Sequence, residues 1–264
     1  MKGPLVVKIG GILLNNNNAI KRLFKAIHVV YKLKKRRIIL VNGGHLFGRN
    51  IFQKFNFFSS KNKFCSIEKL NTKNILFSIL PNIANMRLLA WSKKYKIIGQ
   101  NLLLTDFFNE LIFKSISIKE INFFLKKNKK EILEYIKIIQ MFLEKNIIPF
   151  ICSSGLDLEG NIFNINSDIV AMILTIILNG RLIILTDVSA VLDGKGQRIK
   201  EISYREINSL LDSGSITNGM IIKIQSALIV SKILKKPVEI ASWHNLNDLS
   251  DVFIGKSIGT KIIE

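Results

Sequence analysis

Residues that build disulfides and metal centres are scarce in this 264-residue chain. It has only two cysteines, Cys65 and Cys152, and they lack the paired spacing of a zinc or redox motif. The three histidines, His28, His45 and His244, are scattered along the chain. We therefore assign no residue as a metal ligand and expect neither a zinc site nor a disulfide-stabilised secreted protein.

Long apolar runs are also lacking. No run reaches the roughly 18 residues that a membrane-spanning helix needs, and the longest, around Ile169–Leu178, stops at Asn179. The amino end does not resemble a signal peptide, because Lys8 interrupts its apolar stretch and Asn15–Asn18 replace a small-residue cleavage site. These features predict a globular protein of the cytoplasm without a membrane partner.

Acidic residues are few, with 19 Asp and Glu against 39 Lys and Arg, so the formal net charge is +20. Such an excess can indicate nucleic-acid binding. Here, however, lysine far outnumbers arginine, and the basic residues are spread among asparagine, isoleucine and phenylalanine, which share A/T-rich codons. We attribute the charge to genome base composition and expect no nucleic-acid partner.

Short β-rich apolar runs alternate with helical patterns along the whole chain, as in a mostly parallel sheet covered by helices on both faces. The length fits one compact α/β domain. Within the helical stretch Leu70–Lys94, an interior proline costs about 3 kcal/mol, so Pro81 predicts a break and a second helix over Asn82–Lys93. The lysine-rich stretch Leu111–Lys130 is expected to form a hairpin and a turn.

Two predicted strands run directly into paired glycines. Leu5–Ile9 is followed by Gly10-Gly11, and Ile38–Val41 is followed, after one asparagine, by Gly43-Gly44. Glycines let the backbone approach an anion with its N–H groups free. Either turn alone could be a tight strand-to-helix connection. Because neighbouring parallel strands end at the same sheet edge, the pair predicts one anion-binding cleft.

A third candidate for this edge lies further along the chain. Asn164 and Asp168 precede an apolar helical run, as helix-start residues do. The short apolar run Leu182–Leu185 predicts a buried strand that brings Asp187 to its carboxyl end. A glycine-bearing loop, Asp193–Gly196, follows. Helix start, strand end and glycine loop in this order are typical of a nucleotide site.

Phosphoryl transfer requires positive charge around the moving group, which lysines supply, and an aspartate can hold the lysines in register. Lys8, Asp168 and Lys223 could have these roles. Their spacing alone does not bring them together.

Several stretches resemble the bacterial N-acetylglutamate kinases of the amino-acid kinase family. The likeness spans the chain, is most specific after residue 150 and is patchy from about 53 to 145. The matching stretches are PLVVKIGGILL, NGGH, LLAWSKKY, NINSD, ILTDVSAVLDGKGQRI, SITNGMIIKIQSAL, KKPVEIASW and IGTKI.

The resemblance implies a three-layer α/β/α sandwich over residues 1–264, with a substrate-binding lobe at 1–178 and a nucleotide-binding lobe at 179–264. It implies transfer of the γ-phosphate of ATP, with Mg²⁺, to the side-chain carboxylate of N-acetyl-L-glutamate, in arginine biosynthesis. The implied catalytic residues are Lys8, Asp168 and Lys223. The implied substrate-binding residues are Gly43, Gly44, Ser66 and Asn164. The implied nucleotide-binding residues are Gly10, Gly11, Asp187, Val188, Ser189, Ala190, Val191, Leu192, Ser215, Ile216 and Thr217.

The chain departs from the family pattern where the substrate binds. The HGGG turn of the family is NGGH here, and a substrate-binding arginine falls on Ser66 in a gap-free alignment. The resemblance also implies a homodimer that contacts its partner around Asn82–Lys93 and is insensitive to arginine. Two alternatives stay open: a decayed or re-targeted small-molecule kinase of this fold, and a non-catalytic basic partner protein.

Overall fold

The computed structural model describes residues 3–33, 36–43, 68–111, 117–188, 190–192, 196–203, 205–207, 218–244 and 246–264, with only the backbone described at 68–79, 218–219 and 246–248. The strands are β1 Leu5–Ile9, β2 Ile38–Asn42, β3 Gly99–Leu104, β4 Ile148–Leu156, β5 Ile162–Asn164, β6 Arg181–Thr186, β7 Glu201–Ile202, β8 Val238–Ser242 and β9 Thr260–Ile262. The helices are α1 Gly11–Asn15, α2 Asn17–Lys32, α4 Glu68–Lys94, the 3₁₀ helix η1 Asp106–Leu111, α5 Ile118–Lys127, α6 Lys129–Glu144, α7 Ser167–Ile177, α9 Asn218–Leu234 and α10 Leu246–Ile254.

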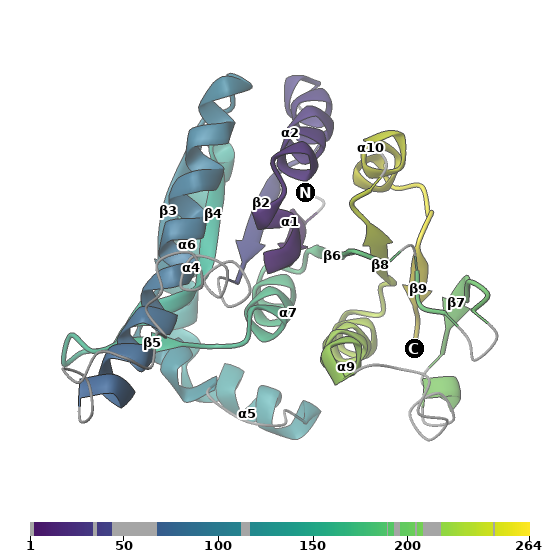
Figure 1. The fold of residues 1–264 in the computed structure, drawn as a ribbon. Coiled ribbons are helices and arrows are strands. Elements are labelled where there is room, and N and C mark those ends of the chain that lie inside the picture. The colour runs from purple at the N-terminus through teal and green to yellow at the C-terminus, as the bar shows by residue number, and fades with distance from the viewer. Residues whose placement is uncertain are drawn as a thin grey trace.

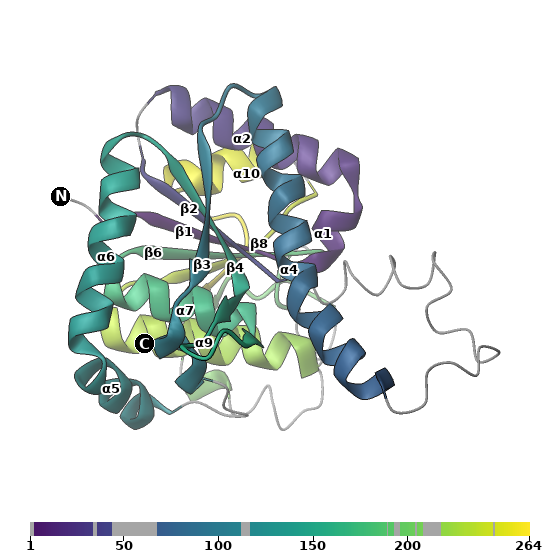
Figure 2. The same ribbon diagram turned by 90° about the vertical axis from the view of Figure 1, so that its left-hand side faces the viewer.

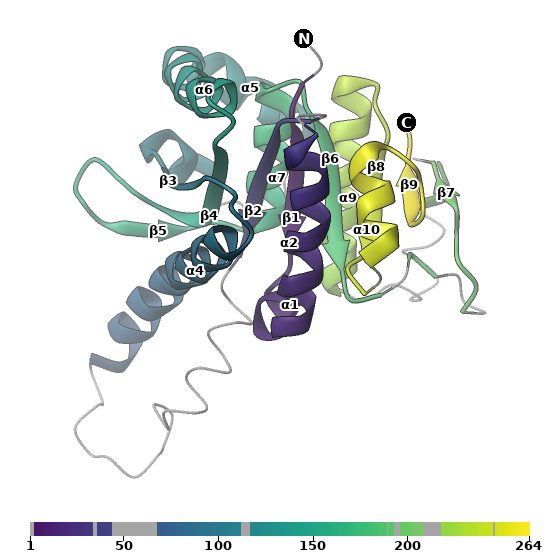
Figure 3. The ribbon, with the colours of Figure 1, turned by 90° about the horizontal axis from the view of Figure 1, so that it is seen from above.

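The described strands form one sheet in the order β3-β4-β2-β1-β6-β8-β9-β7, with β5 beside β4 (Figure 3). The central pairs β4–β2, β2–β1, β1–β6 and β6–β8 are all parallel. Antiparallel pairing occurs at β5 and between β8 and β9. The strands of residues 1–178 make one half of the sheet and those of 179–264 the other (Figure 1).

Helices cover both faces of the sheet. Figure 2 shows α2 and α10 above the strands and α7 and α9 below them. The alternation of side chains in β1 explains these two layers, because successive residues of a strand point to opposite faces. Val7 and Ile9 pack in the core cluster of α2 and α10, whereas Val6 packs in the cluster of α7 and α9. The predicted α/β/α sandwich is confirmed.

The predicted break at Pro81 is wrong, because α4 runs unbroken from Glu68 to Lys94. The helix packs over β4 and β3, and polar contacts fix it to the sheet. The Asn42 side-chain amide donates a hydrogen bond to the Pro81 carbonyl at 3.1 Å, and the Asn85 amide donates to the Phe150 carbonyl at 2.9 Å. Burial against the sheet thus outweighs the cost of one interior proline.

The predicted hairpin over Leu111–Lys130 is also wrong. The stretch predicted as a hairpin contains α5, which begins with a capping box: Ser117 accepts from the Glu120 backbone N–H, and Glu120 accepts from the Ser117 backbone N–H. Asn16 is the N-cap of α2, and its side chain accepts from the backbone N–H groups of Asn18 and Ala19. Among the described helices, none is long and apolar enough to cross a membrane.

Candidate active site

The carboxyl ends of five strands surround a cleft of about 550 Å³. Because β4, β2, β1, β6 and β8 are parallel, they deliver their terminal residues to the same sheet edge. Gly10 follows β1, Gly43 follows β2 and Asp187 follows β6, and all three line the cleft. The prediction that the glycine turns meet at one edge is confirmed for these described residues.

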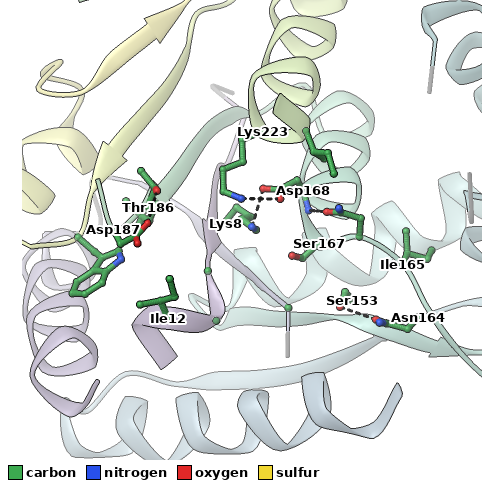
Figure 4. A pocket seen from close by; sticks show the side chains of 17 residues that line it. Lys8, Ile12, Ser153, Asn164, Ile165, Ser167, Asp168, Thr186, Asp187 and Lys223 are labelled. Carbon is green, nitrogen blue, oxygen red and sulfur yellow. Dashed lines mark hydrogen bonds and ion pairs between the residues drawn. The ribbon is translucent and has the colours of Figure 1, made fainter. Parts of the chain in front are cut away.

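Lys8, Asp168 and Lys223 meet in this cleft (Figure 4). The Lys8 Nζ lies 2.8 Å from Asp168 Oδ1, and the Lys223 Nζ lies 3.3 Å from Asp168 Oδ2. The side chains of Lys8 and Asp168 are only 5% and 6% exposed, and that of Lys223 is 18% exposed. The carboxylate thus holds the two ammonium groups at one side of the cleft.

Three different elements position this triad. Lys8 is the fourth residue of β1 and points to the face that α7 covers, next to Val6 in the strand alternation. Asp168 lies in the first turn of α7, where Asn166 caps the helix by accepting from the Asp168 backbone N–H at 2.8 Å. An anion is stabilised at a helix amino end. Lys223 lies inside α9, which packs against α7.

Burial and charge act on this triad in opposite directions. Burial raises the pKa of Asp168, but the Lys8 and Lys223 ammonium groups outweigh it and hold that pKa below its ordinary value. Burial lowers the pKa of Lys8 more than Asp168 raises it, and Lys223 lowers it further. The buried Lys8 therefore costs folding free energy at neutral pH, as expected for a residue kept for chemistry rather than stability.

The other wall of the cleft carries neutral polar groups. Asn164, at the end of β5, accepts a hydrogen bond from the Ser153 hydroxyl at 2.9 Å. Ser167 starts α7 and faces Gly43 so closely that a Cβ at Gly43 would lie 2.6 Å from the Ser167 Oγ. The glycine thus allows β2 and α7 to approach each other. Gly43 and Asn164 line the cleft as predicted, whereas Gly44 and Ser66 fall outside the described residues.

On the side of β6, the cleft is lined by Gly10, Gly11 and Asp187. The Thr186 hydroxyl donates to the Asp187 carboxylate at 3.1 Å. Trp243 also lines the cleft, and its backbone N–H donates to the Thr186 carbonyl at 3.2 Å. This wall combines two glycines with one carboxylate and one large aromatic ring.

The remaining predicted nucleotide residues lie elsewhere or are not described. Val188 is 37% exposed, whereas Ala190 and Val191 are buried, and none of the three lines the cleft. The Val191 backbone N–H donates to the Thr260 hydroxyl at 2.9 Å, so the segment is fixed to the far part of the sheet. Leu192 forms a bridge with Arg198. Residues 189 and 215–217 lie outside the described part of the chain.

Several residues of the cleft were not predicted from the sequence. Ile12, Ile222 and Trp243 line it and supply apolar surface, and Ser153 and Ser167 supply hydroxyl groups. Trp243 could have been found, because it follows the strand run Val238–Ala241 at the same edge as Asp187. The hydroxyl groups of Ser153 and Ser167 carry no comparable signal, since nothing in the local sequence shows that they face a cleft.

A parallel sheet with a buried Lys–Asp–Lys cluster and glycine turns at its carboxyl edge defines a site suited to phosphoryl transfer. Residues 3–242 match the amino acid kinase family. The chain therefore belongs to the amino acid kinase family, which confirms the resemblance seen in its sequence.

Full-length acetylglutamate kinases are among its relatives in this family. The chain is 36% identical over 263 residues to the acetylglutamate kinase of Buchnera aphidicola subsp. Schizaphis graminum, with 100% of each chain covered. It is 32% identical to that of Photorhabdus laumondii subsp. laumondii, with 98% of this chain and 99% of the relative covered.

Solved structures share the fold at lower sequence identity. N-acetylglutamate synthase from Neisseria gonorrhoeae, complexed with coenzyme A and N-acetyl-glutamate, superposes with a TM-score of 0.71 at 16% identity, covering 99% of this chain and 59% of that one. An isopentenyl phosphate kinase superposes with a TM-score of 0.65 at 15% identity, covering 98% of this chain and 99% of that one. At these identities the likeness concerns the fold.

Proposed function

We propose that this protein is a cytoplasmic acetylglutamate kinase, which transfers the γ-phosphoryl group of ATP to the side-chain carboxylate of N-acetyl-L-glutamate and yields an acyl phosphate and ADP. The observation that carries the proposal is the convergence of Lys8, Asp168 and Lys223, with contacts of 2.8 and 3.3 Å, from three elements far apart in sequence. The full-length acetylglutamate kinase relatives support the choice of acceptor.

In this proposal Lys8 and Lys223 stabilise the negative charge on the transferring phosphoryl group. Two preorganised cations in a partly buried cleft act more strongly than in water, because little solvent screens them. Asp168 keeps both ammonium groups pointing to one place and needs no contact with the substrate. Removing one such charge typically costs about 10²- to 10³-fold in kcat.

The nucleotide is proposed to lie on the β6 side, where Gly10 and Gly11 leave backbone N–H groups accessible to phosphate oxygens. The described residues contain no group of three His, Cys, Asp or Glu side chains that could hold a metal ion. Asp187 lines the cleft, and a single protein carboxylate suits Mg²⁺, which commonly binds through substrate phosphates and one or two carboxylates. Asp187 is the carboxylate that would hold it. When bound, Mg²⁺ would neutralise phosphate charge.

The acceptor is proposed to lie between Gly43 and Asn164, on the wall opposite Asp187. The substrate-binding lobe would then be residues 1–178, which carry this wall, and the nucleotide-binding lobe 179–264. Lys8 and Asp168 belong to the first lobe and Lys223 to the second, so the triad would join the two lobes at the point where phosphate is transferred.

We further propose that the protein is a homodimer through α4 and the neighbouring segment before β3. Exposed apolar side chains gather there: Ile83 is 43% exposed, Met86 65% and Ile98 59%. Met86 and Ile98 line a groove together with Leu89. Contiguous exposed apolar surface on a globular domain commonly marks an interface.

The function is tested by a coupled assay of ADP release with purified protein, ATP and Mg²⁺. N-acetylglutamate is compared with aspartate, carbamate and UMP as acceptors. Turnover with N-acetylglutamate, trapped as a hydroxamate by hydroxylamine, is expected. Turnover with another acceptor would instead indicate a re-targeted kinase, and no turnover with any acceptor would contradict the proposed activity.

A further inference from the structure

Ser153 is almost completely enclosed, with 2% of its surface exposed, yet it belongs to the wall of the cleft. Its hydroxyl donates to the Asn164 side-chain carbonyl at 2.9 Å (Figure 4). The backbone around this bond is held by the antiparallel β4–β5 ladder, in which Ser154 pairs with Asn164. The Ile165 N–H also donates to the Ser153 carbonyl at 2.8 Å. The two side chains therefore have little freedom to separate.

In the structure this hydrogen bond engages the carbonyl oxygen of the Asn164 amide. With the carbonyl oxygen engaged by Ser153, the amide nitrogen and its two hydrogens are left for other partners. Within the described part of the chain, no protein acceptor takes a hydrogen bond from this nitrogen. Asn164 is only partly buried and lines the cleft, so its N–H groups can reach a ligand there.

We propose that Ser153 is a positioning residue for acceptor recognition, holding the Asn164 amide with its N–H groups toward the acceptor. The inference rests on the proposed function, because an acceptor that carries carboxylates needs donors around it. In the opposite orientation Asn164 would present a carbonyl oxygen to a carboxylate, and two acceptors repel each other. Ser153 acts through Asn164 and needs no contact with the acceptor itself.

The neighbouring serine offers a matched control. Ser154 is also buried, with 0% exposed, but it does not line the cleft. Its hydroxyl oxygen accepts from the Asn82 amide of α4 at 3.4 Å. Ser153→Ala and Ser154→Ala therefore remove the same atom from adjacent buried positions of one strand, and only the first removal affects Asn164.

The test is steady-state kinetics of Ser153→Ala, Ser153→Cys and Ser154→Ala, with the acceptor that the wild type phosphorylates. A neutral hydrogen bond contributes about 0.5–1.5 kcal/mol, so the acceptor KM of Ser153→Ala should rise roughly 2- to 13-fold. The KM of Ser153→Ala for ATP should not change. In Ser154→Ala, neither the acceptor KM nor the ATP KM should change. Ser153→Cys fills the position but has only a weak donor, so it should show a rise in acceptor KM even where the alanine variant fails to fold.

A double-mutant cycle separates positioning from a general structural effect. Adding Ser153→Ala to Asn164→Ala should cause no further rise in acceptor KM, because the group that Ser153 orients is gone. Additive effects, or an unchanged acceptor KM in both Ser153 variants, would overturn the inference. An inactive wild type would instead refute the proposed function, so the two failures are distinguishable.

Discussion

Replacing Asp168 by asparagine removes the charge that holds two buried lysines together and leaves the side-chain shape almost unchanged. In the wild type, the 2.8 and 3.3 Å contacts to Lys8 and Lys223 hold the Asp168 pKa below its ordinary value. In the variant the two ammonium groups face each other without an anion between them. We expect a large loss of stability as well as of turnover.

Removing one partner of a buried ion pair typically costs about 3–5 kcal/mol. A loss of 1 kcal/mol lowers Tm by about 2–4 °C in a domain of this size. The Asp168→Asn variant should therefore unfold roughly 10 °C below the wild type at pH 7. Asp251→Asn is the matched control, because it breaks an exposed ion pair. The Lys256 Nζ lies 3.1 Å from the Asp251 Oδ1, and the two side chains are 65% and 36% exposed. Exposed pairs contribute at most about 1 kcal/mol.

The loss should also depend on pH in a defined direction. The pKa of Lys8 is already lowered by burial, and without Asp168 it should fall further. Between this lowered pKa and the ordinary lysine value near 10.5, the unfolded chain binds a proton that the folded chain does not. Stability of the variant should therefore rise with pH across this window, and the gap to the wild type should narrow from pH 7 to pH 9.5.

Thermal unfolding of wild type, Asp168→Asn and Asp251→Asn over this pH range measures the effect. A Tm of the Asp168 variant equal to that of the wild type at pH 7 would refute the view that Asp168 balances two buried cations. A gap that stays constant with pH would show that the cost comes from packing or from the cap of α7 and not from the charge of Lys8.

Three further predictions concern the triad, the acceptor and the interface. Lys8→Met should lower kcat about 10²- to 10³-fold in the ADP-release assay, and it should lower Tm less than Asp168→Asn does, because Asp168 keeps its pair with Lys223 at 3.3 Å; a Tm below that of Asp168→Asn would contradict this. Ser66→Arg should lower the acetylglutamate KM and leave the ATP KM unchanged, because an arginine fork binds a carboxylate through two charge-assisted hydrogen bonds. The absence of such an arginine should cost roughly 10- to 150-fold in affinity for acetylglutamate. If neither KM changes, the alignment at this position is wrong. Met86→Glu, at a residue 65% exposed on α4, should convert a dimer to a monomer in light scattering, whereas Met141→Glu, 46% exposed on α6, should not; a wild-type monomer would refute the interface.

The sequence by itself determined the alternation of strands and helices and the chemistry available at the strand ends. β1 and β6 are found where the short apolar runs predicted them, because buried parallel strands need continuous apolar residues. Asp168 was identified as a helix-start residue, because local hydrogen bonding of Asn and Asp side chains favours that position. The capping box of Ser117 and Glu120 was equally local, so α5 could have been predicted from the sequence.

Only the tertiary structure decided which of these residues act together. Lys8, Asp168 and Lys223 belong to different elements, and it is the parallel register of β1 and β6 and the packing of α7 on α9 that bring their charges into contact. The continuity of α4 through Pro81 likewise depends on hydrogen bonds from Asn42 and Asn85. These bonds join α4 to distant strands, so local helix propensity does not predict them. Contacts between distant segments form only when the whole core is buried, so the local sequence around each residue does not predict them.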